Sequence, residues 1–269
     1  MRIGKYNLDL EHQGYIMGIL NVTPDSFSDG ARYQSMDAAL FQAEKMIREG
    51  AAIIDVGGES TRPGHKKITD EEETERVIPI IEAVKKRFDV PISLDTYKYT
   101  VAKAGVAAGA DMINDIWGLK WDSRLAKLIA ENDSACCLMH NRKQTGYQDY
   151  LKDFMDDMRE TLHIADEAGI SREKIMLDPG VGFAKNCDQN LSIIRHLDLL
   201  KEFGLPVLLG TSRKSVIGTV LDLPVEEREE GTMATTVIGR MKGATIFRVH
   251  DVKKNYRAMK MAEAILAAE

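Results

Sequence analysis

The sequence predicts a (β/α)8 TIM barrel with a short N-terminal hairpin. Eight short apolar runs of strand length recur along the 269 residues, and stretches with a helical spacing of apolar residues separate them. Such barrels typically have about 250 residues, which is close to the length of this chain. A doubly wound open sheet is the rival fold, but it usually needs fewer strands, and no G-x-G-x-x-G follows the first run.

The predicted elements follow one another in a regular order. The leading segment, residues 2–14, is expected to form a small hairpin over one end of the barrel. The predicted strands are the runs YIMGIL, AAIIDV, PISLD, DMIND, ACCLM, KIMLD, PVLLG and ATIFRV. No linker or low-complexity tract interrupts this order, so residues 1–269 are expected to form a single domain.

Local signals mark individual helix ends. Gly109 and Gly243 each stand where a helix should stop and a strand should begin, which suits the left-handed conformation that glycine tolerates. Thr69 with Glu72 has the spacing of a capping box at the start of a helix. Pro79 inside that helix predicts either a kink or a late start.

Composition excludes several classes of function. The net charge of -6 argues against a nucleic-acid partner, although a few Arg and Lys in one cleft can still bind a small anion. No apolar run approaches the ~18 residues that a membrane span needs, and the N-terminus lacks a signal-peptide pattern. We therefore expect a cytoplasmic protein with no membrane partner. The three cysteines have no metal-type spacing and are expected to be reduced thiols in the core.

Polar residues close nearly every predicted strand. They are Asn21, Asp55, Asp95, Asn114, Asp115, His140, Asp178, the segment 211–215, Arg248 and His250. In a (β/α)8 barrel the active site lies at the C-terminal ends of the strands. A single aspartate at such a position could equally cap a helix, but stability alone does not require a polar residue at every strand end. The pattern therefore predicts a functional cleft at this end of the barrel.

Two of these strand ends carry cations. Arg248 and His250 are two residues apart, so both lie on one face of the strand, and both can donate hydrogen bonds to an anion. The stretch LLGTSRKS leads from a strand into a helix whose start, at Ser215 beside Lys214, suits a carboxylate or a phosphate. It is not a phosphate-binding loop of the Walker type, because Arg213 precedes the lysine where that motif has glycine.

Other strand ends carry carboxylates and amides. Asp95, Asn114 and Asp178 suit a flat heterocycle that displays several N–H groups. Asn21 offers a neutral oxygen beside the expected phosphate and could ligate Mg2+, which takes few protein ligands when phosphates supply the rest. No spacing typical of a zinc site is present. The cleft therefore implies two substrates, one of them phosphorylated.

The motifs at these positions closely resemble those of the dihydropteroate synthase family of folate biosynthesis. The matching stretches are MGILNVTPDSFSDG, IIDVGGESTRPG, ISLDT, NDIWG, LMHNR, LDPGVGFAKN, LLGTSRKS and RVHDV, and they span essentially the whole chain in the family's order. The resemblance implies a barrel that condenses 6-hydroxymethyl-7,8-dihydropterin pyrophosphate with p-aminobenzoate, releasing pyrophosphate. The stretch NRKQTGYQDY after His140 departs from the commonest family pattern and resembles another branch.

The resemblance also implies roles for individual residues. The pterin would be held by Asp95, Asn114, Asp178 and Lys214, with Ile116, Met139, Phe183 and Gly210 lining its pocket. Pyrophosphate would bind Asn21, Thr61, Arg62, Arg248 and His250, with Mg2+ at Asn21. The p-aminobenzoate would contact Phe27, Thr61, Pro63, Phe183, Lys214 and Ser215.

The chemistry expected from these roles is a dissociative, SN1-like displacement. Asp95 would stabilise positive charge on the pterin, Lys214 would orient the ring, and Arg248 with His250 would neutralise the leaving group. The polar stretch VTPDSFSDG would be a loop that closes over the substrates with Phe27 packed on the second one, or Phe27 would simply tuck into the barrel rim. The stretch STRPGHKKITD would be a second such loop.

Two other functions are compatible with a pterin-binding barrel. One is a methyltransferase acting on methyltetrahydrofolate, which has no need of the TSRKS stretch or of Arg248 and His250 beside Asn21. The other is a non-catalytic pterin-binding protein, which should have lost some of these residues.

The family resemblance also implies a homodimer, and an apolar stripe of Met233, Val237 and Met241 could form its interface or pack in the core.

Overall fold

The main sheet of the protein is a closed parallel barrel. The computed structural model describes residues 1–22, 32–60 and 67–268. The eight strands of this sheet pair in parallel in the order β8-β7-β6-β5-β4-β3-β10-β9, and a parallel bridge between Leu177 and Val207 closes it. The strands are β3 (Tyr15–Asn21), β4 (Ala51–Gly57), β5 (Ile92–Asp95), β6 (Met112–Asp115), β7 (Ala135–Met139), β8 (Ile175–Asp178), β9 (Leu208–Leu209) and β10 (Ile246–Val249). The (β/α)8 prediction is confirmed.

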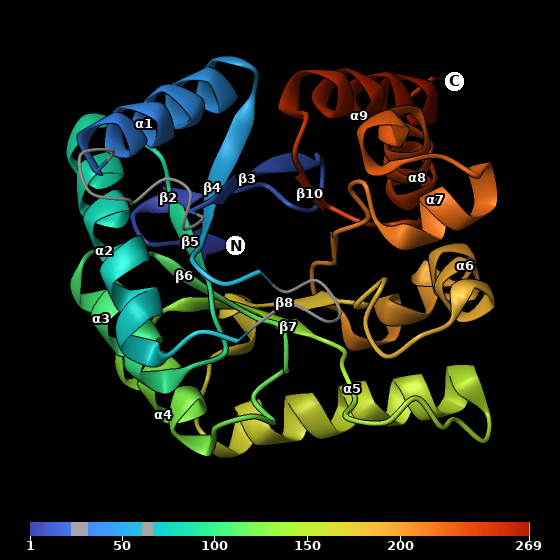
Figure 1. Ribbon diagram of the computed structural model, residues 1–269. Coiled ribbons are helices and arrows are strands. Elements are labelled where there is room, and N and C mark those ends of the chain that lie inside the picture. The colour runs from blue at the N-terminus through green and yellow to red at the C-terminus, as the bar shows by residue number, and fades with distance from the viewer. Residues whose placement is uncertain (23–31, 61–66, 269) are drawn as a thin grey trace.

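The α-helices form a ring around the strands, as Figure 1 shows with the barrel in the centre. The helices of the described residues are α1 (Arg32–Arg48), α2 (Asp70–Arg87), α3 (Tyr99–Ala107), α4 (Ser123–Glu131), α5 (Tyr150–Glu167), α6 (Cys187–Arg195), α7 (Ser215–Leu221), α8 (Glu229–Lys242) and α9 (Val252–Leu266). Short 3-10 turns are η2 (Arg172–Lys174), η3 (Leu197–Phe203) and η4 (Val225–Glu227).

A small hairpin covers the end of the barrel at which the strands begin. Strands β1 (Arg2–Ile3) and β2 (Tyr6–Asn7) pair antiparallel. Ile3, which is fully buried, packs with Leu8 and Leu10 into one cluster with residues near the starts of the barrel strands. Because burial of apolar surface is the main favourable term in folding, this contact fixes the hairpin on the barrel. The predicted N-terminal hairpin is confirmed.

The alternation of side chains along each strand builds two layers inside the barrel. We call the lower one the apolar layer; its strand residues are Met17, Ile53, Met112, Ala135, Cys137, Met176, Leu208 and Ile246. Residues between them, such as Ile54, face the surrounding helices in the larger core cluster. Successive side chains point to opposite faces, so two residues beyond Ile53, Met176 and Ile246 come Asp55, Asp178 and Arg248. The strand pattern thus places polar groups directly above the apolar layer.

Helix α2 tests the local predictions. Thr69 caps it by accepting a hydrogen bond from the Glu72 backbone N–H at 3.1 Å, whereas the Glu72 side chain pairs with Arg76. The helix begins at Asp70 and contains Pro79, so the prediction of a late start is wrong. Four acidic residues in its first turn favour this start, because negative charge there offsets the partial positive charge of the helix N-terminus.

The cysteines divide into two kinds. Cys136 and Cys137 are fully buried in β7, and burial raises the thiol pKa of both. Cys187 is half-buried and begins helix α6. All three are free thiols, as predicted, but only the first two lie in the core.

Candidate functional site

The C-terminal ends of the strands bring charged groups together above the apolar layer. Arg248 lies between two carboxylates: its Nε donates to Asp55 Oδ2 and its terminal nitrogen to Asp95 Oδ2, each at 2.6 Å. Both carboxylates are buried, and within the part of the chain that the structure describes Asp55 Oδ1 and Asp95 Oδ1 have no hydrogen-bond partner. The site therefore holds acceptors that a bound ligand can satisfy.

Asn114 and Asp178 complete what we call the charged layer, namely Asp55, Asp95, Asn114, Asp178 and Arg248. Asn114 Nδ2 donates to Asp55 Oδ2 at 3.4 Å, and Asp178 Oδ1 accepts from the Gly180 backbone N–H at 2.7 Å. Burial raises the pKa of Asp95 and of Asp178, while Arg248 and Lys214 oppose the shift. A ligand that donates N–H groups to these carboxylates would offset the cost of keeping them charged in the interior.

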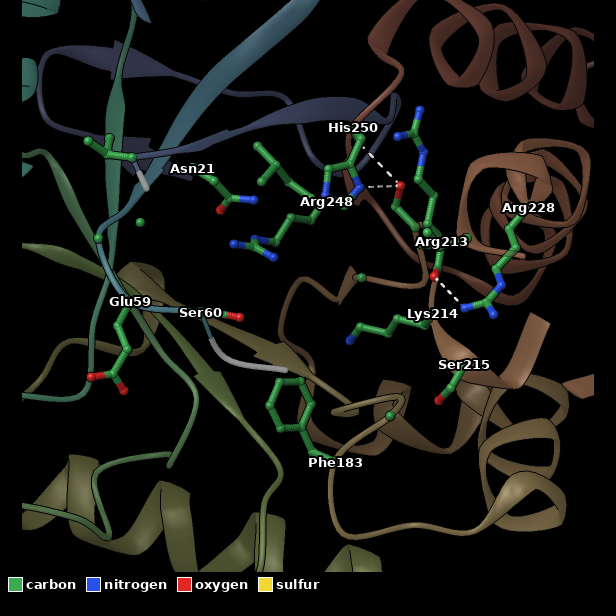
Figure 2. Close-up of a pocket in the computed structure, with 18 residues that line it drawn as sticks. Asn21, Glu59, Ser60, Phe183, Arg213, Lys214, Ser215, Arg228, Arg248 and His250 are labelled. Atoms are coloured by element: carbon green, nitrogen blue, oxygen red, sulfur yellow. Dashed lines mark hydrogen bonds between the residues drawn. The ribbon is translucent and has the colours of Figure 1, made fainter. Parts of the chain in front are cut away.

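A cavity of about 460 Å³ opens above this layer. Figure 2 shows its lining, with Lys214 and Arg248 directed inward and Phe183 beside them. The predicted site residues that line it are Asn21, Phe183, Gly210, Lys214, Ser215, Arg248 and His250. Seven positions from the ends of β3, β9 and β10 and from the loops after β8 and β9 therefore converge, as the sequence pattern predicted.

Lys214 and Phe183 form one wall of this cavity. The Lys214 ammonium lies 4.8 Å from the centre of the Phe183 ring and donates to the Val181 carbonyl. Burial lowers the pKa of Lys214 to about 8, although Asp178 favours its charged form. Ser215 begins α7 directly after Lys214. Because α7 has only seven residues, its dipole is small. An anion at this position would therefore be attracted mainly by Lys214 and the Ser215 hydroxyl.

His250 is oriented by a serine that the sequence analysis passed over. Ser212 Oγ lies 2.9 Å from His250 Nδ1 and accepts from the His250 backbone N–H at 3.1 Å. These two contacts fix the orientation of the imidazole ring. Ser212 was one residue of the quoted TSRKS stretch, but its partner could be found only from the fold.

The loop before α7 is supported by Arg228. Arg213 has a φ of +57°, in the left-handed region, and its carbonyl accepts from Arg228 at 3.2 Å. Arg228 also donates to the Leu223 carbonyl at 3.0 Å. Figure 2 shows Arg228 on the far side of this loop from the cavity centre. No motif in the sequence marked Arg228, because it acts on backbone groups that only the folded chain places near it.

A buried ion network adjoins the cavity, which Glu59 lines. Lys98 lies 2.7 Å from both Glu59 and Glu73, and all three are buried. Tyr97 donates to Glu59 at 2.9 Å, and Lys98 also donates to the Ile68 carbonyl at 2.8 Å. This network ties the end of β4 to the start of α2, but sequence spacing gave no sign of it.

The remaining predicted residues fall into two groups. Ile116 and Met139 are buried with Tyr97 in an apolar cluster, against which Phe183 packs. Phe27, Thr61, Arg62 and Pro63 lie outside the described residues, as do most of the two predicted loops. The floor beneath the cavity is formed by five further predicted residues: Asp95, Asn114, Asp178, Ile116 and Met139. None of these five lines the cavity itself.

The donor set at the cavity agrees with a hard cation held mainly by a ligand's phosphates. No three His, Cys, Asp or Glu side chains group into a metal site within residues 1–22, 32–60 and 67–268. Asn21 does line the cavity, and so does Arg248, which pairs with the Asp55 and Asp95 carboxylates. Oxygen donors of this kind fit Mg2+, which usually keeps several waters and few protein ligands.

Comparison with known proteins assigns the chain to a family. The profile of the family described as "Pterin binding enzyme" matches residues 17–250. A dihydropteroate synthase of Clostridium beijerinckii is 54% identical over 267 residues, which cover 99% of each chain. The chain belongs to the dihydropteroate synthase family. It is therefore an enzyme, a transferase of folate biosynthesis.

Solved structures of dihydropteroate synthases have the same fold. One from Clostridium difficile, determined in the presence of pteroic acid, is 48% identical with a TM-score of 0.94 and covers 97% of this chain and 100% of its own. One from Yersinia pestis, in a complex with a sulfonamide drug, is 42% identical with a TM-score of 0.93 and covers 100% and 99%. Within the described residues no helix of this protein has the length and apolar character of a membrane span.

Proposed function

We propose that the protein condenses 6-hydroxymethyl-7,8-dihydropterin pyrophosphate with p-aminobenzoate to give 7,8-dihydropteroate and pyrophosphate. One observation carries this proposal: Arg248 joins a buried carboxylate floor to a cavity lined with cations, in a chain of the dihydropteroate synthase family. The whole chain acts as one barrel domain in this proposal, and the protein works in the cytoplasm.

The pterin occupies the floor of the cavity. Asp95 and Asp178 accept its N–H groups, Asn114 adds an amide, and Lys214 donates to the ring. Ile116, Met139, Phe183 and Gly210 surround the ring. The free oxygen of Asp95 and the raised pKa values of both aspartates support this placement, because hydrogen bonds from the ligand would stabilise the ionised carboxylates.

The diphosphate lies at the cationic side of the cavity. Arg248 and His250 donate to its oxygens, Thr61 and Arg62 assist, and Asn21 supplies one oxygen ligand for Mg2+. When bound, Mg2+ would neutralise part of the charge on the diphosphate. The contacts of Ser212 with His250 support this role, because they hold the ring in one orientation at the cavity.

The p-aminobenzoate lies against the wall of Lys214 and Ser215. Its carboxylate meets the Ser215 hydroxyl and the Lys214 ammonium, and its ring packs against Phe183. By the family resemblance, Phe27, Thr61 and Pro63 would also contact it. Sulfonamides carry a similar ring and inhibit by occupying this place. The Yersinia pestis relative, solved with a sulfonamide drug, supports this part of the proposal.

Bond breaking comes first in the reaction. The bond between the pterin methylene and the diphosphate oxygen breaks, and its electron pair leaves with the diphosphate, which Arg248 and His250 stabilise. The pterin ring delocalises the positive charge, and the Asp95 carboxylate stabilises that charge beside it. The amine of p-aminobenzoate then attacks the methylene carbon and releases one proton.

We also propose that the protein acts as a homodimer. Met241 on α8 is exposed, whereas Met233 and Val237 of the same stripe are half-buried. Further large apolar residues are exposed nearby on α7, α8 and α9: Val220, Leu221, Ile238, Met261, Ile265 and Leu266. Exposed apolar residues gathered on neighbouring helices favour association with another chain.

Release of pyrophosphate tests the proposed reaction directly. Purified protein receives the dihydropterin pyrophosphate and Mg2+, with and without p-aminobenzoate, alongside the variant Asp95→Ala. Release that requires p-aminobenzoate and is lost in the variant is the expected result. Binding of the pterin without any release would overturn the proposal in favour of a non-catalytic protein, and turnover of methyltetrahydrofolate would favour a methyltransferase.

A further inference from the structure

A lysine outside the proposed mechanism lies behind the turn that connects β8 to α6. Among the described residues, the Lys185 ammonium donates to His140 Nδ1 at 2.8 Å, to the Gly180 carbonyl at 2.9 Å and to the Phe183 carbonyl at 3.0 Å. In its charged form the amine has three N–H groups, so these acceptors use all of them. Burial lowers the pKa of Lys185 to about 7, while the nearby Asp178 carboxylate favours the charged form. Lys185 therefore connects the end of β7 to both ends of the turn 180–183.

This turn contacts Asp178 of the charged layer and carries Phe183 of the cavity lining. Gly180 donates to Asp178 Oδ1 at 2.7 Å, and the Phe183 N–H donates to the Gly180 carbonyl at 3.1 Å. Gly180 has a φ of +67°, and a Cβ added there would lie 2.0 Å from the His140 carbonyl oxygen. The backbone is thus packed closely against the end of β7. A shift of this turn would move the Asp178 carboxylate and the Phe183 ring together.

Lys185 is itself held by a chain of polar groups, in which His140 is buried and Asp157 and Arg142 are half-buried. His140 Nε2 lies 2.8 Å from Asp157 Oδ2, and Asp157 accepts from Arg142 at 2.5 and 3.0 Å. Burial lowers the pKa of His140 to about 4, so the ring is neutral at ordinary pH. A neutral ring that accepts from Lys185 must donate from Nε2, so both neighbours fix the same tautomer.

A second lysine contacts the same turn from the opposite side. Lys214 donates to the Val181 carbonyl from inside the cavity, and Figure 2 shows its side chain beside Phe183. When Lys214 donates to a substrate, it can give up its hydrogen bond to the Val181 carbonyl. Lys185 does not line the cavity, and its three acceptors are groups of the protein itself.

We propose that Lys185 is a positioning residue of the pterin pocket, which it serves by fixing the turn that presents Asp178 and Phe183. The proposal rests on the proposed function, since it assumes that the pterin binds Asp178. Arg248 and His250, which act on the leaving group, lie on other strands. Lys185 therefore controls substrate affinity more than the rate of bond breaking, because a preorganised pocket loses less free energy on binding.

The first test replaces the ammonium with an apolar group of similar length, Lys185→Met. The KM for the dihydropterin pyrophosphate is expected to rise about tenfold, which corresponds to ~1.4 kcal/mol, with kcat changed by less than about threefold. Calorimetry of the same pterin without p-aminobenzoate should show the same loss of affinity. A KM within about twofold of wild type would overturn the proposal.

The chain offers a matched control at the other end of the same strand. Lys174 directly precedes β8, is buried, and donates to the Asp133 carbonyl at 2.9 Å and to its carboxylate at 2.8 Å. Lys174→Met removes a comparable buried ammonium far from the cavity. It should lower the melting temperature without raising the KM for the pterin; an equal rise in both variants would mean that Lys185 has a merely structural role.

Two further variants keep the outcomes distinct. Asp178→Asn tests the pterin floor itself: if it leaves the KM unchanged, or if wild type shows no condensation, the proposed function fails and not the role of Lys185 alone. Asp157→Asn weakens the support of His140 and should raise the KM about threefold with the fold intact. If Lys185→Met does not fold, an unchanged KM in Asp157→Asn would still overturn the proposal.

Discussion

On β4, β6, β8 and β10 the charged layer lies two residues beyond the apolar layer, yet the groups of the two layers have very different partners. Ile53 and Met176 are fully buried among apolar neighbours, and the hairpin residue Ile3 closes the cluster below them. Above them, Asp55 and Asp95 each keep a buried oxygen without a partner among the described residues. The lower layer is arranged for stability and the upper one for a ligand, so changes in each should affect different properties.

The largest expected effect is on catalysis in the charged layer. Asp95→Asn removes the charge that stabilises the cationic pterin and should lower kcat about 10²–10³-fold. The unfolding midpoint should stay the same or rise, because burial disfavours the Asp95 carboxylate and a neutral amide avoids that cost. Steady-state kinetics and denaturant unfolding measure the two. A clear loss of stability with normal kcat would show that Asp95 serves the fold and not catalysis.

The next effect is the reverse case in the apolar layer. Ile53→Ala leaves a cavity beneath the site and should lower the free energy of unfolding by about 2–5 kcal/mol. Well below the melting temperature, kcat/KM should remain within about twofold, because Asp55 keeps its contact with Arg248. Val56→Ala on the same strand, which faces the helices, is the control for a general loss of packing. A selective loss of activity in Ile53→Ala would show that the two layers are coupled.

Stability should depend on pH through His140, which lies at the rim above the apolar layer. The unfolded chain binds a proton at this histidine near pH 6.5, whereas the folded protein does so only near pH 4, because burial lowers the pKa. Stability should therefore fall as the pH decreases from 6.5 to 4, by up to about 3 kcal/mol. Urea unfolding across this range measures the change. His140→Asn should flatten the profile; an unchanged slope would assign it to other groups.

The smallest expected effect concerns the hairpin below the apolar layer. Ile3→Val removes one buried methylene and should lower the free energy of unfolding by about 0.5–1.5 kcal/mol. Activity should be unaffected, since the hairpin covers the end of the barrel opposite to the cavity. Thermal unfolding with an activity assay at 25 °C checks both. A fall in kcat would mean that the lower end of the barrel influences the charged layer.

The fold and the ends of the strands could be predicted from sequence because both depend on short-range patterns. Alternation of apolar residues marked the strands, and the residue closing each run, such as Asp95 or Asp178, lay at the expected end of the barrel. Because active sites of such barrels form at this end, these residues together predicted a functional cleft. Asn21, Lys214 and His250 were found in the cavity lining for the same reason.

Pairings across the barrel could not be predicted in this way. Asp55 and Arg248 are 193 residues apart, and their contact exists because the closed sheet places β4 two strands from β10. Asp55 was predicted to close a strand, but no role was predicted for it. The contacts of Lys98 with Glu59 and of Lys185 with His140 were missed as well, since their spacing of 39 and 45 residues matches no local motif.

The distribution of the cysteines gives this protein a built-in attachment point. Cys136 and Cys137 are enclosed in β7 with raised pKa values, so neither forms the reactive thiolate readily. Cys187 begins α6, two residues after Lys185, and is partly exposed. A maleimide dye should therefore couple at this position in the unmodified chain. Its fluorescence would report ligand-dependent changes beside the turn 180–183 without any engineered cysteine.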